Sequence, residues 1–310
     1  MATTPHPLQT ALDRTTAATY SAVDLIDIAH QRKATSVDGK ITRPDARQVS
    51  LYHAAIASSV AAIEDSFEGL TLAGIHSLGV NHVVLERLAT VVGRALQSPQ
   101  PDEIDKLMSG FFEGFRPSEH WSADLRYSEA AYRKVKRTGN SHRYIHTIYN
   151  PTKTFRGKEL ADAVSRFVKM RNSFAHQDAS VTLFNKQQKD AFKRLRAKKA
   201  SSRQDIEMVE AINATCAVVL DAGQDGASTP LVEWTVHETH AINSLCLCIG
   251  LVMSSCSALA DHLGMNASKY EPLHLCVQKG RWSELAVGIL APTPGIDLHF
   301  AAYKPKSRVA

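Results

Sequence analysis

The sequence predicts an all-α protein, a bundle of four to five helices interrupted by two long insertions. Four long segments carry apolar residues at spacings of three and four, the pattern of one helical face. These segments span residues 51–70, 79–97, 158–178 and 236–263. No segment repeats at a period of about 20 to 50 residues, which argues against a solenoid. A chain of 310 residues with 44% hydrophobic content can bury the core that such a bundle needs.

The first two predicted helices follow each other closely and should pack together. The apolar face of 51–70 consists of Tyr52, Ile56, Val60, Ile63, Phe67 and Leu70. The same spacing recurs in 79–97 at Val84, Leu88, Val91 and Leu96. By contrast, residues 1–50 offer one good apolar patch, at 20–29, so we expect a peripheral arm with a short helix there.

Two insertions and a tail divide the rest of the chain. Residues 99–157 contain repeated breakers such as "SPQPDE" and "FRPSEHW", and we expect one or two small helices. The second insertion, 179–235, ends in an alternating stretch that allows a short strand pair. The helical domain with its insertions would then cover 51–265, and a C-terminal extension would cover 266–310.

The last long helix contains an uncharged stretch, 241–260, which raises the question of a membrane span. Asn243 and several serines reduce its apolarity, and Asp261 follows at once, so we favour a buried core helix. The N-terminus lacks the pattern of a secretory signal peptide. The five cysteines form no Cys-x-x-Cys pair, and a reducing cytoplasm is the expected location.

The stretch "RNSFAH", 171–176, stands out at the end of the third helix. The apolar stripe through Leu160, Val164 and Phe167 continues to Arg171, where burial of a guanidinium requires an acid or a bound anion. Asn172 and His176 are four apart and lie on neighbouring parts of the helix surface. A cation, an amide and a titratable imidazole in one cluster suit phosphoryl chemistry on RNA without a metal. From spacing alone, a C-terminal helix cap remains the alternative.

"RNSFAH" resembles the Arg-Asn-x-x-x-His signature of the HEPN superfamily, helical bundles that include many defence and toxin ribonucleases. The first helix, "LYHAAIASSVAAIEDSFEGL", is similar to that of the HEPN group found beside ribonuclease L and plant stress proteins. The resemblance implies a site made by Arg171, Asn172, His176 and Glu64. In it Arg171 and His176 would be catalytic, Asn172 would support them, and Glu64 would be the buried partner of Arg171, with Asp65 as its rival.

This resemblance covers about a third of the chain, in 51–97, 158–178 and 236–263. It implies a metal-independent endoribonuclease that leaves a 2′,3′-cyclic phosphate and needs no cofactor. It also implies a homodimer in which two signatures share one cleft. Such a protein would act as a toxin or an anti-phage defence effector, with an antitoxin or regulatory partner. The alternative from another class is a non-catalytic helical module that binds RNA or protein.

Two basic clusters are candidates for RNA contact, although the formal net charge is only +5. In the run 186–203 the candidate RNA-binding residues are Lys193, Arg194, Arg196, Lys198 and Lys199, and a solvated helix face is the alternative. In 132–143 cations are interleaved with nearby tyrosines that could stack unpaired bases, and packing onto the bundle is the alternative.

Other chemistries find little support in the sequence. There is no P-loop and no Gly-x-Gly-x-x-Gly, which disfavours nucleotide hydrolysis and a Rossmann enzyme. His142 and His146, and the pair in "HETH" at 237–240, lack further ligands at complementary spacing, so no metal site is expected.

Overall fold

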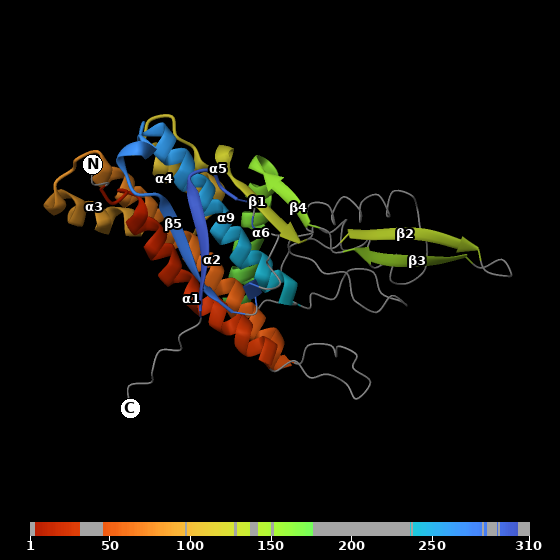
Figure 1. The fold of residues 1–310 in the computed structure, drawn as a ribbon. Coiled ribbons are helices and arrows are strands. Elements are labelled where there is room, and N and C mark those ends of the chain that lie inside the picture. Colours follow the sequence, from red (N-terminus) through yellow and green to blue (C-terminus); the bar gives the residue numbers. More distant parts are fainter. Residues whose placement is uncertain are drawn as a thin grey trace, which may run out of the picture.

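In the computed structural model, helices make up most of the described residues, and three small two-stranded sheets lie among them (Figure 1). The structure describes residues 4–31, 46–96, 98–126, 129–136, 142–149, 152–175, 236, 238–280, 282–283, 290 and 292–302. The helical class predicted from the sequence is therefore broadly right, and the sheets are an addition to it. The strand pair expected within 179–235 lies outside the described residues.

The four long helices predicted from periodicity are all present, with shifted ends. The helices are α1 (Gln9–Gln31), α2 (Ala46–Ser77), α3 (His82–Ala95), α4 (Pro101–Ser109), α5 (Pro117–His120), α6 (Gly157–Ala175), α9 (Glu238–His262) and the 3-10 turn η1 (Ala267–Lys269). The segment 51–70 corresponds to α2, 79–97 to α3, 158–178 to α6 and 236–263 to α9. All six residues of the predicted apolar face of α2 are buried.

The strands form three separate pairs. Strand β1 (Ser122–Arg126) runs antiparallel to β4 (Thr152–Arg156), and β2 (Glu129–Lys136) runs antiparallel to β3 (His142–Tyr149). In the tail, β5 (Leu273–Lys279) pairs in parallel with β6 (Ile296–Ala302). The prediction for 99–157 was thus incomplete: the small helices α4 and α5 are there, but the four strands were missed.

Helix α9 lies in the core, as expected for the uncharged stretch that it contains. It contacts α1, α2 and β1, and it is buried continuously from His240 to Cys256. Among the described helices it alone is long and apolar enough to cross a membrane, but most of its apolar length is covered by the rest of the protein. Burial raises the pKa of the Cys248 and Cys256 thiols to about 12, so both are inert core residues.

The expectation of a loose N-terminal arm is wrong for α1, which packs along α2 and also contacts α9 and β5 (Figure 1). Its buried face includes Leu12, Thr15, Thr19, Val23 and Ile26. Two threonines occupy core positions because each hydroxyl donates to a helix carbonyl, Thr15 Oγ1 to Ala11 O at 3.0 Å and Thr19 Oγ1 to Thr16 O at 2.8 Å. These bonds remove the cost of burying an unpaired hydroxyl.

Helix α3 begins where the Asn81 side chain accepts a hydrogen bond from Val83 N at 2.9 Å, an N-cap contact. It packs on α2, as predicted, but only half of the predicted stripe, Leu88 and Leu96, packs toward the core. Val92 and Leu96 are buried, whereas Val84 and Val91 are 48% and 59% exposed. The other half of the apolar stripe that the sequence predicted for this helix therefore lies on the surface.

Two helical glycines should respond oppositely to substitution by alanine. A Cβ on Gly250 of α9 would lie 2.7 Å from Ala123 Cβ and 3.1 Å from Ser122 O of β1, so Gly250→Ala should destabilise the protein by about 1 to 3 kcal/mol. A Cβ on Gly93 of α3 would meet only Glu68 Oε2, at 3.6 Å, so Gly93→Ala should stabilise by about 0.5 to 1 kcal/mol. Urea unfolding of both variants checks this, and equal effects would contradict the close approach of α9 to β1.

Candidate functional site

Three acidic residues on one turn of α2 organise the polar contacts around the predicted site. Glu64, Asp65 and Glu68 fall within an arc of about 100° of the helix surface, next to the buried Phe67. Arginines from two other helices meet this arc, Arg171 from α6 and Arg14 from α1. Helix α2 thus carries its acids between α1 and α6, and each arginine has its own carboxylate.

Arg171 pairs with Glu64, the acid that was preferred over Asp65 on the sequence. Its Nη1 atom lies 3.4 Å from Glu64 Oε2, and the two side chains are 21% and 28% exposed. Its Nε atom donates to Asn172 Oδ1 at 3.1 Å. Arg171 thus has the acidic partner that its position in the stripe requires, and it also donates to the neighbouring Asn172. The catalytic roles of these residues stay predictions.

The third residue of the signature, His176, lies outside the described residues, and its position relative to Arg171 stays a prediction. Phe167 and Val168 are buried on α6, while Asn172 is exposed. The α6 stripe therefore passes from the core to the surface near its C-terminal end. Among the described residues, Glu64 and Asn172 are the hydrogen-bond partners of Arg171, and its Nη2 group donates to neither.

Burial raises the pKa of Glu64, and the charge and hydrogen bond of Arg171 oppose this rise. The neighbouring carboxylates of Asp65 and Glu103 add to the increase, because a second negative charge nearby disfavours ionisation. Arg171 therefore favours the charged form of Glu64, which burial disfavours, and the pKa of Glu64 depends in part on Arg171. This dependence links the two residues energetically.

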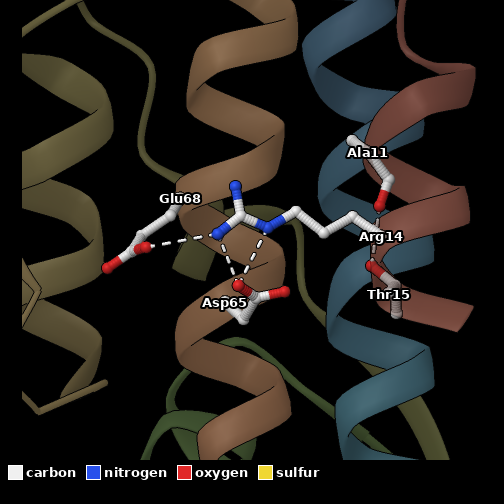
Figure 2. A network of polar contacts seen from close by, with 5 residues as sticks. All are labelled: Ala11, Arg14, Thr15, Asp65 and Glu68. Atoms are coloured by element: carbon white, nitrogen blue, oxygen red, sulfur yellow. Dashed lines mark hydrogen bonds and ion pairs between the residues drawn. The ribbon is translucent and has the colours of Figure 1, made fainter. Parts of the chain in front are cut away.

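Figure 2 shows the second arginine, Arg14, reaching from α1 across to α2. Its Nε donates to Asp65 Oδ1 at 2.8 Å, its Nη2 also contacts Asp65, and Nη2 lies 3.5 Å from Glu68 Oε2. The stem of Arg14 lies against Gly69, where a Cβ would come within 2.8 Å of Arg14 Cδ. Asp65, the alternative partner considered for Arg171, instead binds Arg14 of α1.

Arg14 and Glu68 belong to this cluster, but the sequence did not predict them as site residues. The expectation of a peripheral arm in 1–50 left Arg14 out of the predicted site. A signal was available: Leu8, Leu12, Thr15, Thr19 and Val23 recur at spacings of three and four, and accepting threonine as a core residue would have extended the helix to Arg14. Burial raises the pKa of Glu68 as well, and Arg14 opposes the rise.

Two further groups of residues were considered for function: the basic residues of 186–203 and the histidines at 142 and 146. Lys193, Arg194, Arg196, Lys198 and Lys199 lie outside the described residues. His142 and His146 lie on strand β3 and not on a helix, and four strand residues span about 13 Å, too far for one metal ion. Within the described part of the chain, no three histidine, cysteine or acidic side chains are arranged to hold a metal.

Comparison with protein-family models, with curated proteins and with solved structures gives no match to this chain. The likeness to HEPN proteins therefore depends on the signature and helix order alone.

Proposed function

We propose that this protein is a metal-independent endoribonuclease of HEPN type, with the bundle and helix order of that superfamily. The observation that carries the proposal is the contact between Glu64 of the first predicted helix and Arg171 of the signature, residues 107 positions apart. The resemblance to HEPN proteins implies the same pair. The free Nη2 group, judged on the described residues, leaves Arg171 able to bind a phosphate oxygen.

The proposed reaction uses the substrate's own 2′-hydroxyl as the nucleophile. The 2′-oxygen attacks the adjacent phosphorus, the bond from phosphorus to the 5′-oxygen breaks, and the products are a 2′,3′-cyclic phosphate and a 5′-hydroxyl. A neutral imidazole of His176 accepts the 2′ proton, and a protonated one returns a proton to the leaving oxygen. Arg171 stabilises the charge that grows on the phosphate, while Asn172 and Glu64 orient it.

A homodimer fits this chemistry, because two signatures facing each other across a two-fold axis supply one imidazole as base and a second as acid. The basic run with Lys193, Arg194, Arg196, Lys198 and Lys199 would hold the RNA backbone. In the proposed biology the enzyme is a toxin or an anti-phage effector of the cytoplasm, restrained by an antitoxin or regulatory partner.

One observation favours the alternative, a non-catalytic helical module. The Glu64 carboxylate already compensates Arg171, and two further carboxylates, Asp65 and Glu68, share the same turn of α2. A phosphate approaching Arg171 therefore meets negative charge as well as the guanidinium. In a non-catalytic module, the contact between Arg171 and Glu64 would serve only to hold α6 against α2.

Incubation of the purified protein with total RNA and a tRNA pool in EDTA tests the proposal. We expect fragments with 2′,3′-cyclic phosphate and 5′-hydroxyl ends. Lys169→Ala serves as the matched control, because Lys169 is exposed on α6 beside the signature and should leave cleavage unchanged. If no RNA is cleaved but RNA is still retarded in a gel-shift assay, the ribonuclease hypothesis is rejected and the non-catalytic RNA-binding module is favoured.

A further inference from the structure

The β2–β3 ladder is a two-stranded ribbon with an unusual arrangement of residue types. Its antiparallel register sets Tyr132 opposite His146, Lys134 opposite Tyr144, and Lys136 opposite His142. Figure 1 shows the ribbon extending away from the helices, and no other described element packs closely along either strand. Within the described part of the chain, the ribbon therefore stands apart from the helical core.

The register sorts the residues of the ribbon into two sets, because alternate positions of a strand belong to one face. One face carries the positions Tyr132, Lys134, Lys136, His142, Tyr144 and His146. The opposite face carries the positions Ala131, Arg133, Val135, Arg143, Ile145 and Thr147. On the first face the three pairs nearest the turn each contain an aromatic ring, two of them also contain a lysine, and the outermost pair, Ala130 with Ile148, contains neither. On the opposite face only the outermost pair, Glu129 with Tyr149, contains a ring.

That combination matches the chemistry of an unpaired nucleic-acid strand. A base that is free of pairing can stack on an aromatic side chain, and such stacking favours binding of any unpaired base. A lysine beside the ring attracts the adjacent phosphate and releases counterions. Directly opposed positions lie about 5 Å apart, so one ring and one cation can serve neighbouring parts of the same nucleotide. Paired bases in a duplex present no face for stacking.

We propose that the face of the β2–β3 ribbon defined by Tyr132, Lys134, Lys136, His142, Tyr144 and His146 binds unpaired RNA. The choice of RNA depends on the proposed ribonuclease function, whereas binding of an unpaired strand does not depend on catalysis at Arg171. The ribbon would select single-stranded segments of the substrate. The opposite face has two arginines but no ring among its central pairs, which makes it the natural comparison.

The test measures binding of a labelled unpaired RNA of about 12 nucleotides, and of a duplex of equal length, by fluorescence anisotropy. The protein carries His176→Ala so that no RNA is consumed. We expect Tyr132→Val with Tyr144→Val to weaken unpaired RNA binding by about tenfold or more and to leave duplex binding nearly unchanged. Valine keeps the strand preference of the positions, and circular dichroism checks that the fold is retained.

A charge-matched pair of variants separates the proposed face from general attraction. Lys134→Gln with Lys136→Gln should weaken binding and lower the salt slope by about 1.4, while Arg133→Gln with Arg143→Gln removes equal charge from the other face with a smaller effect. Equal losses from both faces, or unchanged binding in the tyrosine variant, would overturn the proposal. If the wild type binds RNA through the ribbon but cleaves none, the proposed ribonuclease activity is refuted, while RNA binding by the ribbon is supported.

Discussion

Replacement of His176 by alanine is expected to reduce RNA cleavage by about 10²- to 10⁴-fold, with the free energy of unfolding changed by less than about 0.5 kcal/mol. The imidazole is proposed to move protons, which alanine cannot do. An ordinary histidine titrates near pH 6.5, so the wild-type rate should depend on pH around that value. The measurement is the single-turnover rate in EDTA across this range, with urea unfolding of the same samples.

The neighbouring change Gln177→Ala provides a matched control for the His176 experiment, because it alters the same part of the chain without removing a titratable group. It should keep both the rate and its pH dependence. If His176→Ala unfolds the protein, the histidine is a helix cap and the catalytic assignment fails. Retained cleavage by a folded His176→Ala protein would exclude it as the base.

Replacement of Arg171 by alanine is expected to lower both activity and stability. Cleavage should fall by about 10²- to 10³-fold, because the charge on the phosphate loses its main stabilising cation. The free energy of unfolding should fall by about 1 to 2 kcal/mol, because Glu64 stays largely covered without a partner. The estimate is below that for a fully buried pair, since Glu64 and Arg171 retain 28% and 21% exposure. Paired cleavage and urea-unfolding measurements on this variant check both losses.

The loss of stability in Arg171→Ala should depend on pH in a defined direction. Burial raises the pKa of Glu64 and Arg171 opposes this rise, so the variant should show a higher pKa for this carboxyl. A group with a raised folded pKa binds more protons in the folded state, and its contribution to stability is lost as pH increases through that pKa. The destabilisation should therefore be larger at about pH 7 than at about pH 4.

A double-mutant cycle with Glu64→Gln isolates this effect. Glutamine retains an oxygen that can accept from Arg171 but cannot titrate at these pH values. In the Glu64→Gln background, Arg171→Ala should cost less and should lose its pH dependence. Unchanged unfolding of Arg171→Ala at both pH values would show that the contact to Glu64 contributes nothing and that Arg171 is held by other means.

Periodicity predicted the helices well where burial is dominated by large apolar side chains. The face of α2 from Tyr52 to Leu70 was correct for this reason, and so was the Arg171 position, since a charge in such a stripe must find a partner. The pairing of Arg171 with Glu64 came from the resemblance and not from spacing, because spacing along one helix says nothing about which helix lies opposite.

The failures have specific physical causes. Helix α1 was underestimated because its buried face uses threonines that satisfy their hydroxyls within the helix. Helix α3 exposes Val84 and Val91 because its buried side runs through Leu88, Val92 and Leu96, so only half of the predicted stripe faces the core. The strands β2 and β3 were missed because the breakers in 99–157 were interpreted as separating small helices, although 144–149 is rich in aromatic and β-branched residues.

The N-terminal segment and helix α1 are hydrogen-bonded to parts of the chain that are synthesised much later. Gln9 donates from Nε2 to His274 O at 2.8 Å and accepts from His274 N at 3.1 Å, while Thr4 O accepts from Glu271 N at 2.9 Å. These contacts join residues about 265 positions apart, and α1 also lies against α9. Contacts of such long sequence separation slow folding because the intervening loop must be closed first. During translation α1 can pair with α2 early, but its remaining surface stays uncovered until β5 leaves the ribosome, so a ribosome-bound chain truncated before β5 should expose that surface to chaperones.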